Sequence, residues 1–345
     1  NAQVNWADST SGGGSPTDLA SVTGADGTAS TTWRFGVRVG AQLLRIKEVA
    51  SGKTVTVTGT ATVTFSDVQA GNFHACALST TSRIYCWGLN DVGQLGKGTN
   101  LNTSTPSTAI SITGDTTAGA NTLTARQLTG SRSSTCALTI AEAVYCWGRR
   151  WGGVATSNLP LAVDINAGGG SGGPLAISYL QVSEDHGCLI QASGVSNCTG
   201  NNDQGQLGDR SASPFPSPTA NTWPWVDVLR TFSNIKLGTS FSCGFHRYLT
   251  EATTVPLVAD SSQIPLCWGD GASGQRGDST TLNGAAQLAS TPKHIKVKGL
   301  AAGIVFDSLS LAVGEKHACV VVAATSATGV GDAYCWGLNA HGQLG

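Results

Sequence analysis

Short apolar runs alternate with turn-forming residues along most of the chain. The stretch Val55-Thr56-Val57-Thr58 alternates with a period of two, the pattern of a half-buried β-strand. Strand-like runs at residues 3–6, 29–35, 42–46 and 54–63 are separated by glycine-containing stretches. No amphipathic helix longer than about two turns is visible. The pattern predicts an all-β protein.

The part of the chain after residue 63 contains an internal repeat. Its first copy reads His74-Ala75-Cys76-Ala77-Leu78, then Ile84-Tyr85-Cys86-Trp87-Gly88-Leu89-Asn90, then Gly93-Gln94-Leu95-Gly96. Four further copies keep the cysteines, although the second decays after Arg149 and the third has Thr199 after its second cysteine. The first cysteines of successive copies are 60, 52, 55 and 76 residues apart. Kelch-like propeller blades repeat at about 50 residues, and insertions between strands account for the excess.

Ten cysteines form five sequential pairs, three of which share a separation of ten residues. Two short antiparallel strands would place the members of each pair opposite one another, within the distance that a disulfide accepts. We therefore predict five disulfides within hairpins, and persistent disulfides indicate an oxidising, extracellular compartment. The alternative, ten reduced cysteines in a cytosolic protein, leaves the even count and the local pairing unexplained. The predicted pairs are Cys76/Cys86, Cys136/Cys146, Cys188/Cys198, Cys243/Cys267 and Cys319/Cys335.

Composition narrows the classes of partner. Charged residues make up 12% of the chain and the net charge is −1, without a basic stripe, so the sequence gives no support for nucleic-acid binding. No run of 18 or more apolar residues is present, so we expect no direct membrane span. The chain contains no methionine, and we expect it to be a processed or partial product.

The Gly-x-x-His-x-Cys-Ala-Leu, Tyr-Cys-Trp-Gly-x-Asn and Gly-Gln-Leu-Gly series resembles the regulator of chromosome condensation repeat in its cysteine-bearing bacterial form. The resemblance covers residues 64–345. It implies a β-propeller of four-stranded blades, usually seven in this family, of which five cysteine-marked units are visible here. Residues 227–236 and 293–306 are candidates for additional strands between the marked hairpins.

Residues 1–63 differ from the repeats. The run from Asp26-Gly27-Thr28-Ala29 through Trp33-Arg34-Phe35-Gly36 to Gly40-Ala41-Gln42 is similar to the C-terminal half of the bacterial Ig-like domains of invasin- and intimin-type surface proteins. A complete sandwich of this kind needs about 100 residues. We therefore predict a partial Ig-like β-sandwich. Either upstream sequence completes it or a neighbouring chain supplies the missing strands.

Few residues suggest chemistry. No Gly-x-Ser-x-Gly elbow, phosphate-cradling loop or metal-ligand spacing is present, so we predict no catalytic residue, no metal site and no cofactor. His74, His186 and His317 recur two residues before a cysteine and are interpreted as local hydrogen-bonding residues. Arg276-Gly277-Asp278 spells an adhesive tripeptide, but it occupies a position that reads Leu-Gly-Asp or Leu-Gly-Lys in other copies.

Tryptophans divide into two groups. Those of the Trp-Gly elements are interpreted as blade-packing residues. Trp151, Trp223 and Trp225 lie outside the repeat consensus in loop-like segments, and exposed aromatic residues are frequent binding anchors. These three are the candidate surface-binding residues.

We expect an extracellular cell-surface protein whose propeller is a rigid, non-catalytic platform for protein or glycan partners, because a propeller scaffold does not fix one function. The first alternative is a self-assembling structural subunit of a surface layer or filament, in which the partner is another copy of the chain. The second is a secreted enzyme or enzyme inhibitor.

Overall fold

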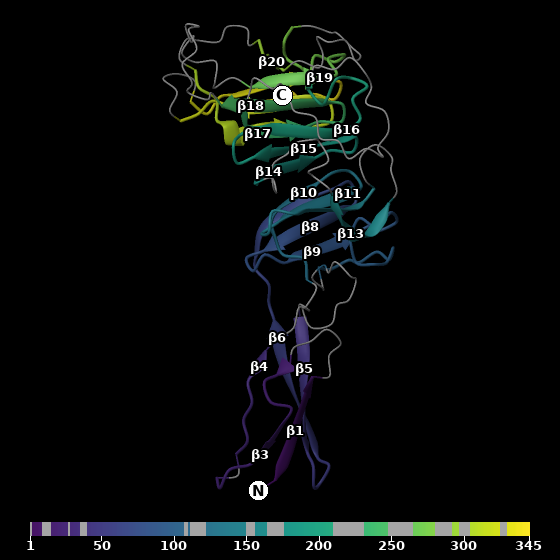
Figure 1. Ribbon diagram of the computed structural model, residues 1–345, viewed down its shortest axis with the longest axis vertical. Helices are drawn as coiled ribbons and strands as arrows, with labels where there is room; N and C mark the ends of the chain where they lie inside the picture. Colours follow the sequence, from purple (N-terminus) through teal and green to yellow (C-terminus); the bar gives the residue numbers. More distant parts are fainter. Residues whose placement is uncertain are drawn as a thin grey trace.

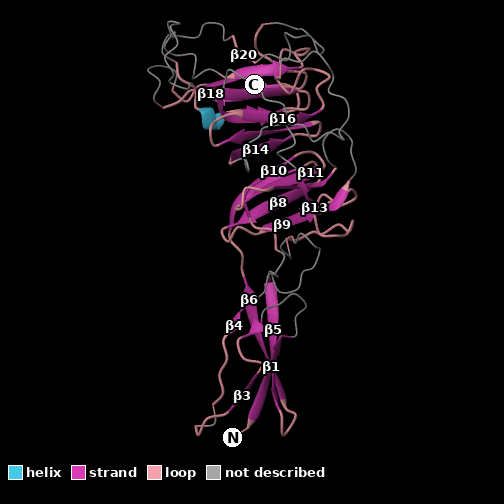
Figure 2. Ribbon diagram, in the orientation of Figure 1, coloured by secondary structure: helices cyan, strands magenta, loops and turns pink. Residues whose placement is uncertain are grey.

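The computed structural model describes thirteen segments of the chain, and the fold is built almost entirely from antiparallel strands (Figures 1 and 2). Within them the one helix is the short 3₁₀ turn η3 (Ser308–Ser310), and no helix is long and apolar enough to cross a membrane. The described residues are 2–8, 15–26, 28–34, 40–106, 110, 122–149, 156–163, 176–209, 231–247, 265–279, 292–296, 304–324 and 330–345.

The N-terminal part contains two sheets. A four-stranded sheet has the order β3-β1-β5-β6, and a two-stranded sheet pairs β2 with β4. In Figure 1 these strands form a narrow body below the sheets of the repeats. The strands are β1 (Gln3–Asp8), β2 (Ser15–Pro16), β3 (Ala20–Val22), β4 (Trp33–Arg34), β5 (Gly40–Glu48) and β6 (Thr54–Ala61).

The N-terminal sheet buries little of its apolar face. Leu44 of β5 is buried, and Val57 of β6 lies directly opposite it in the register and so on the same face. Val55, two residues away on that face, is nevertheless 62% exposed. An Ig-like classification of this sheet stays a prediction.

The repeats form five sheets, which we call blades 1 to 5 in chain order. Blade 1 contains β7 (Phe65–Ala70), β8 (His74–Ser79) and β9 (Ile84–Gly88). Blade 2 contains β10 (Ala125–Gly130), β11 (Ser134–Thr139), β12 (Val144–Gly148) and β13 (Ser157–Val163). Blade 3 contains β14 (Ile177–Val182), β15 (His186–Gln191) and β16 (Ser196–Gly200). Blade 4 contains β17 (Thr231–Leu237), β18 (Phe241–Arg247), β19 (Leu266–Gly269) and β20 (Lys293–His294). Blade 5 contains β21 (Ala312–Val313), β22 (His317–Val321) and β23 (Ala333–Gly337).

Each cysteine pair is directly opposed in the ladder between the second and third strands of its blade. All five predicted disulfides are present, each with its Cα atoms 4.1 Å apart. They join Cys76 to Cys86, Cys136 to Cys146, Cys188 to Cys198, Cys243 to Cys267 and Cys319 to Cys335. The expected additional strands are also found, because β17 begins within residues 227–236 and β20 begins at Lys293.

The disulfide of blade 5 differs from the other four in burial. Cys319 and Cys335 are only partly buried, whereas the eight cysteines of blades 1 to 4 are at most 1% exposed. Cys243 and Cys267 of blade 4 share one apolar cluster with residues of blade 5 such as Val320. Within the described residues blade 5 is the last blade, so no following blade covers Cys335 in the same way. The five disulfides, which hold the same place in the repeat, therefore differ in burial.

The glycine of the Trp-Gly element is required by close backbone approach. Gly269 has φ +98°, and a Cβ atom there would lie 2.6 Å from the carbonyl oxygen of Ser240. The corresponding Gly88 and Gly337 have φ +109° and +108°, and each would place a Cβ atom 2.4 Å from a carbonyl oxygen. Only glycine adopts this conformation without strain, which explains its recurrence at the end of the third strand.

Neighbouring blades are joined by the tryptophan of the Trp-Gly element. The indole Nε1 of Trp147 in blade 2 donates to the backbone carbonyl of Gln94, which belongs to the Gly-Gln-Leu-Gly loop of blade 1. Trp268 makes the same bond to Gln206 and Trp336 makes it to Gln275, each at 2.9 Å. Trp147 and Trp268 are fully buried. The interpretation as blade-packing residues is confirmed for these three tryptophans, and for Trp87 it stays a prediction.

Blades 2 and 3 are joined differently, because blade 3 has Thr199 in place of the tryptophan. The side-chain amide of Gln127 on β10 instead bonds the backbone of Leu180 on β14, accepting from its N–H at 3.0 Å and donating to its carbonyl at 2.8 Å. Thr129 Oγ1 accepts from the N–H of Val182 at 3.2 Å. Side chains on β10, the first strand of blade 2, thus hydrogen-bond to the backbone of β14, the first strand of blade 3.

Two of the recurring histidines bond across blades, and His186 also bonds within its own blade, where its Nδ1 lies 2.9 Å from Ser183 Oγ. His74 Nε2 lies 2.9 Å from Thr135 Oγ1 of blade 2, and His186 Nε2 lies 2.8 Å from Ser242 Oγ of blade 4. The prediction of a local hydrogen bond is therefore confirmed for His186, which bonds the next blade as well. For His74 the partner belongs to the next blade, and for His317 the bond stays a prediction. Sequence alone could not show the two bonds between blades, because they join residues 61 and 56 positions apart.

Candidate functional site

Each blade contributes to one end of the propeller, which we call the turn face. The face contains the turn between the first and second strands of each blade and the loop after its third strand. The two meet because the chain reverses direction at each turn, so the third strand ends where the first one ends. A repeated backbone bond connects them, from Leu89 N to Phe73 O in blade 1 at 2.8 Å and from Asp270 N to Ser240 O in blade 4 at 2.9 Å.

A central depression of about 340 Å³ opens where the turns of all five blades come together. Its charged residues are Arg132, Glu184 and Glu315, each four residues before the first cysteine of its blade. The lining residues are Ala70, Gly71, Asn72, Gly130, Ser131, Arg132, Gln181, Val182, Ser183, Glu184, Leu237, Gly238, Thr239, Val313, Gly314 and Glu315.

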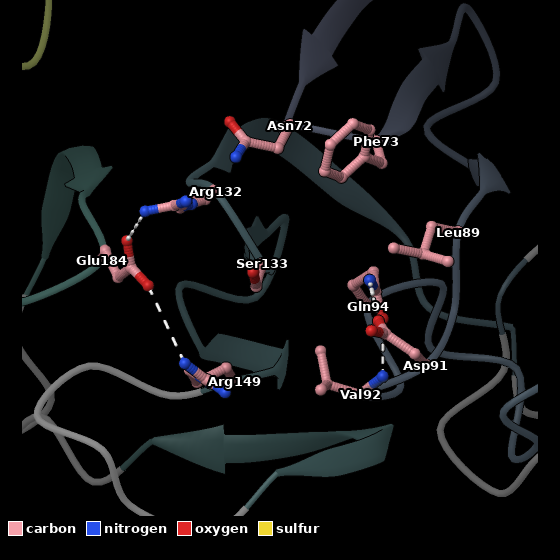
Figure 3. A pocket seen from close by; sticks show the side chains of 10 residues that line it. All are labelled: Asn72, Phe73, Leu89, Asp91, Val92, Gln94, Arg132, Ser133, Arg149 and Glu184. Carbon is pink, nitrogen blue, oxygen red and sulfur yellow. Dashed lines mark hydrogen bonds and ion pairs between the residues drawn. The ribbon is translucent and has the colours of Figure 1, made fainter.

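A second hollow, which we call the peripheral pocket, has a volume of about 330 Å³ (Figure 3). It lies between the turn and loop of blade 1 on one side and blade 2 on the other, with one residue from blade 3. It is lined by Asn72, Phe73, Leu89, Asp91, Val92, Gln94, Arg132, Ser133, Arg149 and Glu184.

The two walls of the peripheral pocket differ in chemistry. Phe73, Leu89 and Val92 form an apolar wall from blade 1, and Figure 3 shows them across the pocket from Arg132 and Arg149. The Glu184 carboxylate lies between the two guanidinium groups, 3.6 Å from Arg132 Nη1 and 4.0 Å from Arg149 Nη1. These are loose ion pairs, and both arginine side chains stay more than half exposed.

The loop beneath the pocket is held by its own side chains. Gln94 Oε1 accepts from the N–H of Val92 at 3.0 Å, and Gln94 Nε2 donates to Asp91 Oδ1 at 2.8 Å. Asn90 Oδ1 accepts from the N–H of Leu95 at 2.9 Å. The same asparagine bond recurs at Asn202 and Asn339, so the loop is a fixed part of the repeat.

Titratable groups with the largest pKa shifts lie between the blades rather than in the pocket. Burial lowers the pKa of His74 to about 4 and that of His186 to about 3. On the turn face, burial raises the pKa of Asp185, and the negative charges of Glu184 and Asp203 raise it further. Blade 3 therefore presents closely spaced carboxylates beside the arginines of blade 2.

The residues singled out from the sequence have different outcomes. Trp151, Trp223 and Trp225 lie outside the described residues, so their role as surface anchors stays a prediction. The Arg276-Gly277-Asp278 tripeptide is buried, with its arginine 1% exposed and its arginine and aspartate 3.0 Å apart. An integrin-like receptor could not reach it.

The ten predicted disulfide cysteines lie away from both hollows. None of them, from Cys76 in blade 1 to Cys335 in blade 5, lines the central depression or the peripheral pocket. Each bridge instead ties the second strand of its blade to the third. The cysteines therefore belong to the frame that carries the turn face.

Sequence reasoning missed Phe73, Arg132, Arg149 and Glu184. A usable signal was their departure from the repeat, because Phe73 stands three residues before a cysteine where the other copies are polar. These equivalents are Ser133, Asp185, Ser240 and Lys316. Conversely, which of these departures converge in one pocket depends on how blades 1, 2 and 3 pack.

Comparison with known families and proteins agrees with this architecture. The family described as regulator of chromosome condensation (RCC1) repeat matches residues 65–94 and 82–138. The probable E3 ubiquitin-protein ligase HERC4 of Homo sapiens is 29% identical over 220 residues, 63% of this chain. The human ligase HERC2 is 25% identical over 245 residues, 69% of this chain. The chain spans only 18% of the length of HERC4 and 4% of HERC2.

Solved structures show the same fold. Human WBSCR16 superposes with a TM-score of 0.58 at 15% identity, covering all of this chain and 90% of that one. Prp20p from Saccharomyces cerevisiae gives a TM-score of 0.56 at 24% identity, covering 79% of this chain and 56% of that one. The protein is therefore an all-β protein of the propeller class. More particularly, its residues 65–138 match the regulator of chromosome condensation repeat.

Proposed function

We propose that this chain is an extracellular, non-catalytic platform that binds a protein partner on its turn face. The observation that carries the proposal is the separation of two sets of positions in the repeat. Tryptophan, glycine and disulfide positions hold the blades, whereas turn-face positions such as those of Phe73, Arg132 and Asp185 change character from blade to blade. A rigid frame with variable surface positions is suited to recognition.

Similar proteins support a protein partner over a glycan. Prp20p is described with binding to Gsp1p and histones, and a further structure has yeast RCC1 bound to Kap60. Five disulfides support an oxidising, extracellular setting. The non-catalytic role is supported by the placement of the shifted histidines, which are buried between blades.

Site-specific photocrosslinking tests the platform. A photoreactive amino acid replaces Asn72 on the turn face or, as the matched control, Thr81 in the exposed turn at the opposite end of blade 1. The full chain is then exposed to the extracellular fraction of its source. We expect a discrete protein adduct from position 72 and none from position 81. Equal labelling from both ends, a glycan adduct, or no adduct would overturn the proposal.

We also propose that residues 1–63 form a separate module from residues 64–345. Among the residues that the structure describes, strands β1 to β6 pair only with one another. The exposed Val55 and Val57 on the outer strand β6 favour a second candidate function, self-assembly through this sheet. Sedimentation at increasing concentration tests it, and a chain that stays monomeric at high concentration would refute it.

A further inference from the structure

We propose that the peripheral pocket binds a partner segment in which an aspartate or glutamate side chain stands beside a bulky apolar side chain. The inference rests on the proposed platform function and names the chemistry of its partner.

The apolar wall is not required by the fold. Phe73 is 72% exposed, so its ring does not fill the interior of a blade. Other blades keep the same turn with serine, aspartate or lysine at this position, as at Ser133 and Lys316. Leu89 and Val92 stand beside it in the same pocket. Exposed apolar residues that gather around a hollow mark a contact site for another apolar group.

The cationic wall has unused capacity for a carboxylate. Each guanidinium carries five N–H donors in a planar fork that matches a carboxylate. The single Glu184 carboxylate contacts Arg132 and Arg149 only at 3.6 and 4.0 Å. The position of the Glu184 carboxylate shows where an anion sits beside the two arginines. N–H donors of both guanidinium groups are left for a second carboxylate from a partner.

The charges in the pocket favour a singly charged group. Arg132 and Arg149 are balanced by Asp91 and Glu184, so the pocket lining has no net charge, and a doubly charged phosphate would bring more uncompensated negative charge into the pocket than a carboxylate does. Asp91 is already bonded to Gln94, and Glu184 to the arginines, so a basic ligand would compete with existing partners. In a segment that has a carboxylate beside an apolar side chain, the carboxylate can contact the two arginines and the apolar side chain can contact the apolar wall.

The corresponding place between blades 3 and 4 has the same frame but different chemistry. There the N–H of Gln204 donates to Gln206 Oε1 at 2.9 Å, as Val92 does to Gln94. Phe73 is replaced by Asp185, and Arg149 by Asp270. The repeat therefore builds the loop, and the identity of the variable residues builds the pocket.

The test is a selection with the full chain immobilised and a random peptide library displayed on phage as the probe. Enriched peptides are synthesised with a fluorescein label, and their dissociation constants are measured by fluorescence anisotropy. We expect enriched peptides to share an acidic residue next to an aromatic or branched aliphatic residue. No enrichment, or enrichment of basic peptides, would overturn the inference.

Variants borrowed from other blades locate the binding site. Phe73→Ser and Arg149→Asp install residues that the same positions already carry in blades 2 and 4, so we expect both chains to fold. Each should weaken peptide binding by about tenfold, the scale of one charge-assisted contact or one buried apolar anchor. Lys316→Ser, the matched change in blade 5, should leave the dissociation constant unchanged.

Equal weakening by Lys316→Ser, or full binding by Arg149→Asp, would refute the assignment to this pocket. The photocrosslinking at position 72 distinguishes failure of the proposed pocket ligand from failure of the proposed platform function. If a protein adduct forms there but no acidic–apolar peptide is enriched, the pocket inference fails and the platform stands. If neither is seen, both fail.

Discussion

Replacing Ser242 with alanine removes one hydroxyl from a buried chain of hydrogen bonds between blades 3 and 4. Ser242 Oγ donates to the backbone carbonyl of Gln206 at 2.9 Å, and that carbonyl also accepts from Trp268 Nε1. Since the one hydroxyl proton is used there, Ser242 accepts from His186 Nε2, which therefore carries the imidazole proton. His186, Ser242 and Trp268 are fully buried.

The magnitude follows from what Ser242→Ala leaves behind. His186 Nε2–H loses its acceptor, and a buried unsatisfied donor costs about 1–3 kcal/mol. The backbone carbonyl of Gln206 still accepts from Trp268 Nε1, so the free-energy cost of losing the Ser242 donor there is smaller. We expect about 2–3 kcal/mol of destabilisation, or a fall in Tm of about 3–5 °C for a domain of this size. Guanidinium unfolding under non-reducing conditions, followed by tryptophan fluorescence, measures it.

The next interface supplies the matched control. At the equivalent positions of blades 4 and 5 the chain has Gly238, Phe241 and Ala318, an apolar set in which Phe241 packs against Gly238. The combined change Ser183→Gly, His186→Phe and Ser242→Ala copies that set between blades 3 and 4. We expect it to recover stability to within about 1 kcal/mol of the original chain, because no polar group stays unpaired.

A cost of less than about 0.5 kcal/mol for Ser242→Ala, the scale of a neutral surface change, would show that the hydroxyl satisfies no buried donor. A combined variant as unstable as Ser242→Ala alone would show the same.

Three further predictions concern stability. The pKa values of His74 and His186 are about 4 and about 3 in the fold and about 6.5 in the unfolded chain, so the folded chain binds fewer protons. The contribution of the two neutral histidines to the free energy of unfolding is therefore complete above pH 6.5. Below pH 6.5 it falls by about 1.4 kcal/mol per pH unit for each histidine. Unfolding midpoints between pH 7 and 4.5 measure this slope, and the combined variant lacking His186 should be less sensitive; an unchanged slope would contradict the argument. Gly269→Ala should destabilise the chain by more than about 2 kcal/mol. Gly331→Ala, at φ +84° with no atom of the described residues within 4 Å of the added Cβ, should cost about 1 kcal/mol in the same assay; equal costs would count against the close approach at Gly269. Removing the Cys243–Cys267 disulfide, which spans 24 residues, should cost about 1 kcal/mol more than removing Cys188–Cys198, which spans 10, and a smaller cost for the longer span would argue against a loop-entropy origin.

Sequence patterns predicted the hairpins because their determinants are local. Cys136 and Cys146 stand opposite one another as soon as their two strands pair, and the strands pair through a short turn. The glycine after Trp147 was visible for the same reason, since its backbone conformation belongs to the strand end itself. The N-terminal strands were likewise visible as alternating runs, and the structure places β5 and β6 there.

The contacts between blades were harder to predict from the sequence. The tryptophan of the Trp-Gly element was expected to pack, but its carbonyl partner on the preceding blade was not indicated by spacing. Gln127 illustrates the difficulty further, because it joins blades 2 and 3 by bonding the backbone of Leu180, which is 53 positions away. Such a position reads as an ordinary polar residue until Leu180 is placed beside it. The partial exposure of Cys335 is of the same kind, since burial depends on the neighbouring blade.

The sequence by itself determined an all-β chain of disulfide-stapled hairpins repeated as propeller blades, because strand pairing and cysteine bridging act over tens of residues or fewer. Tertiary structure alone decided which side chains share the peripheral pocket. Phe73, Arg149 and Glu184 come from three different blades and have no common spacing in the chain. Their proximity depends on the angle and distance at which one blade packs against the next, and those are set by many interior contacts acting together.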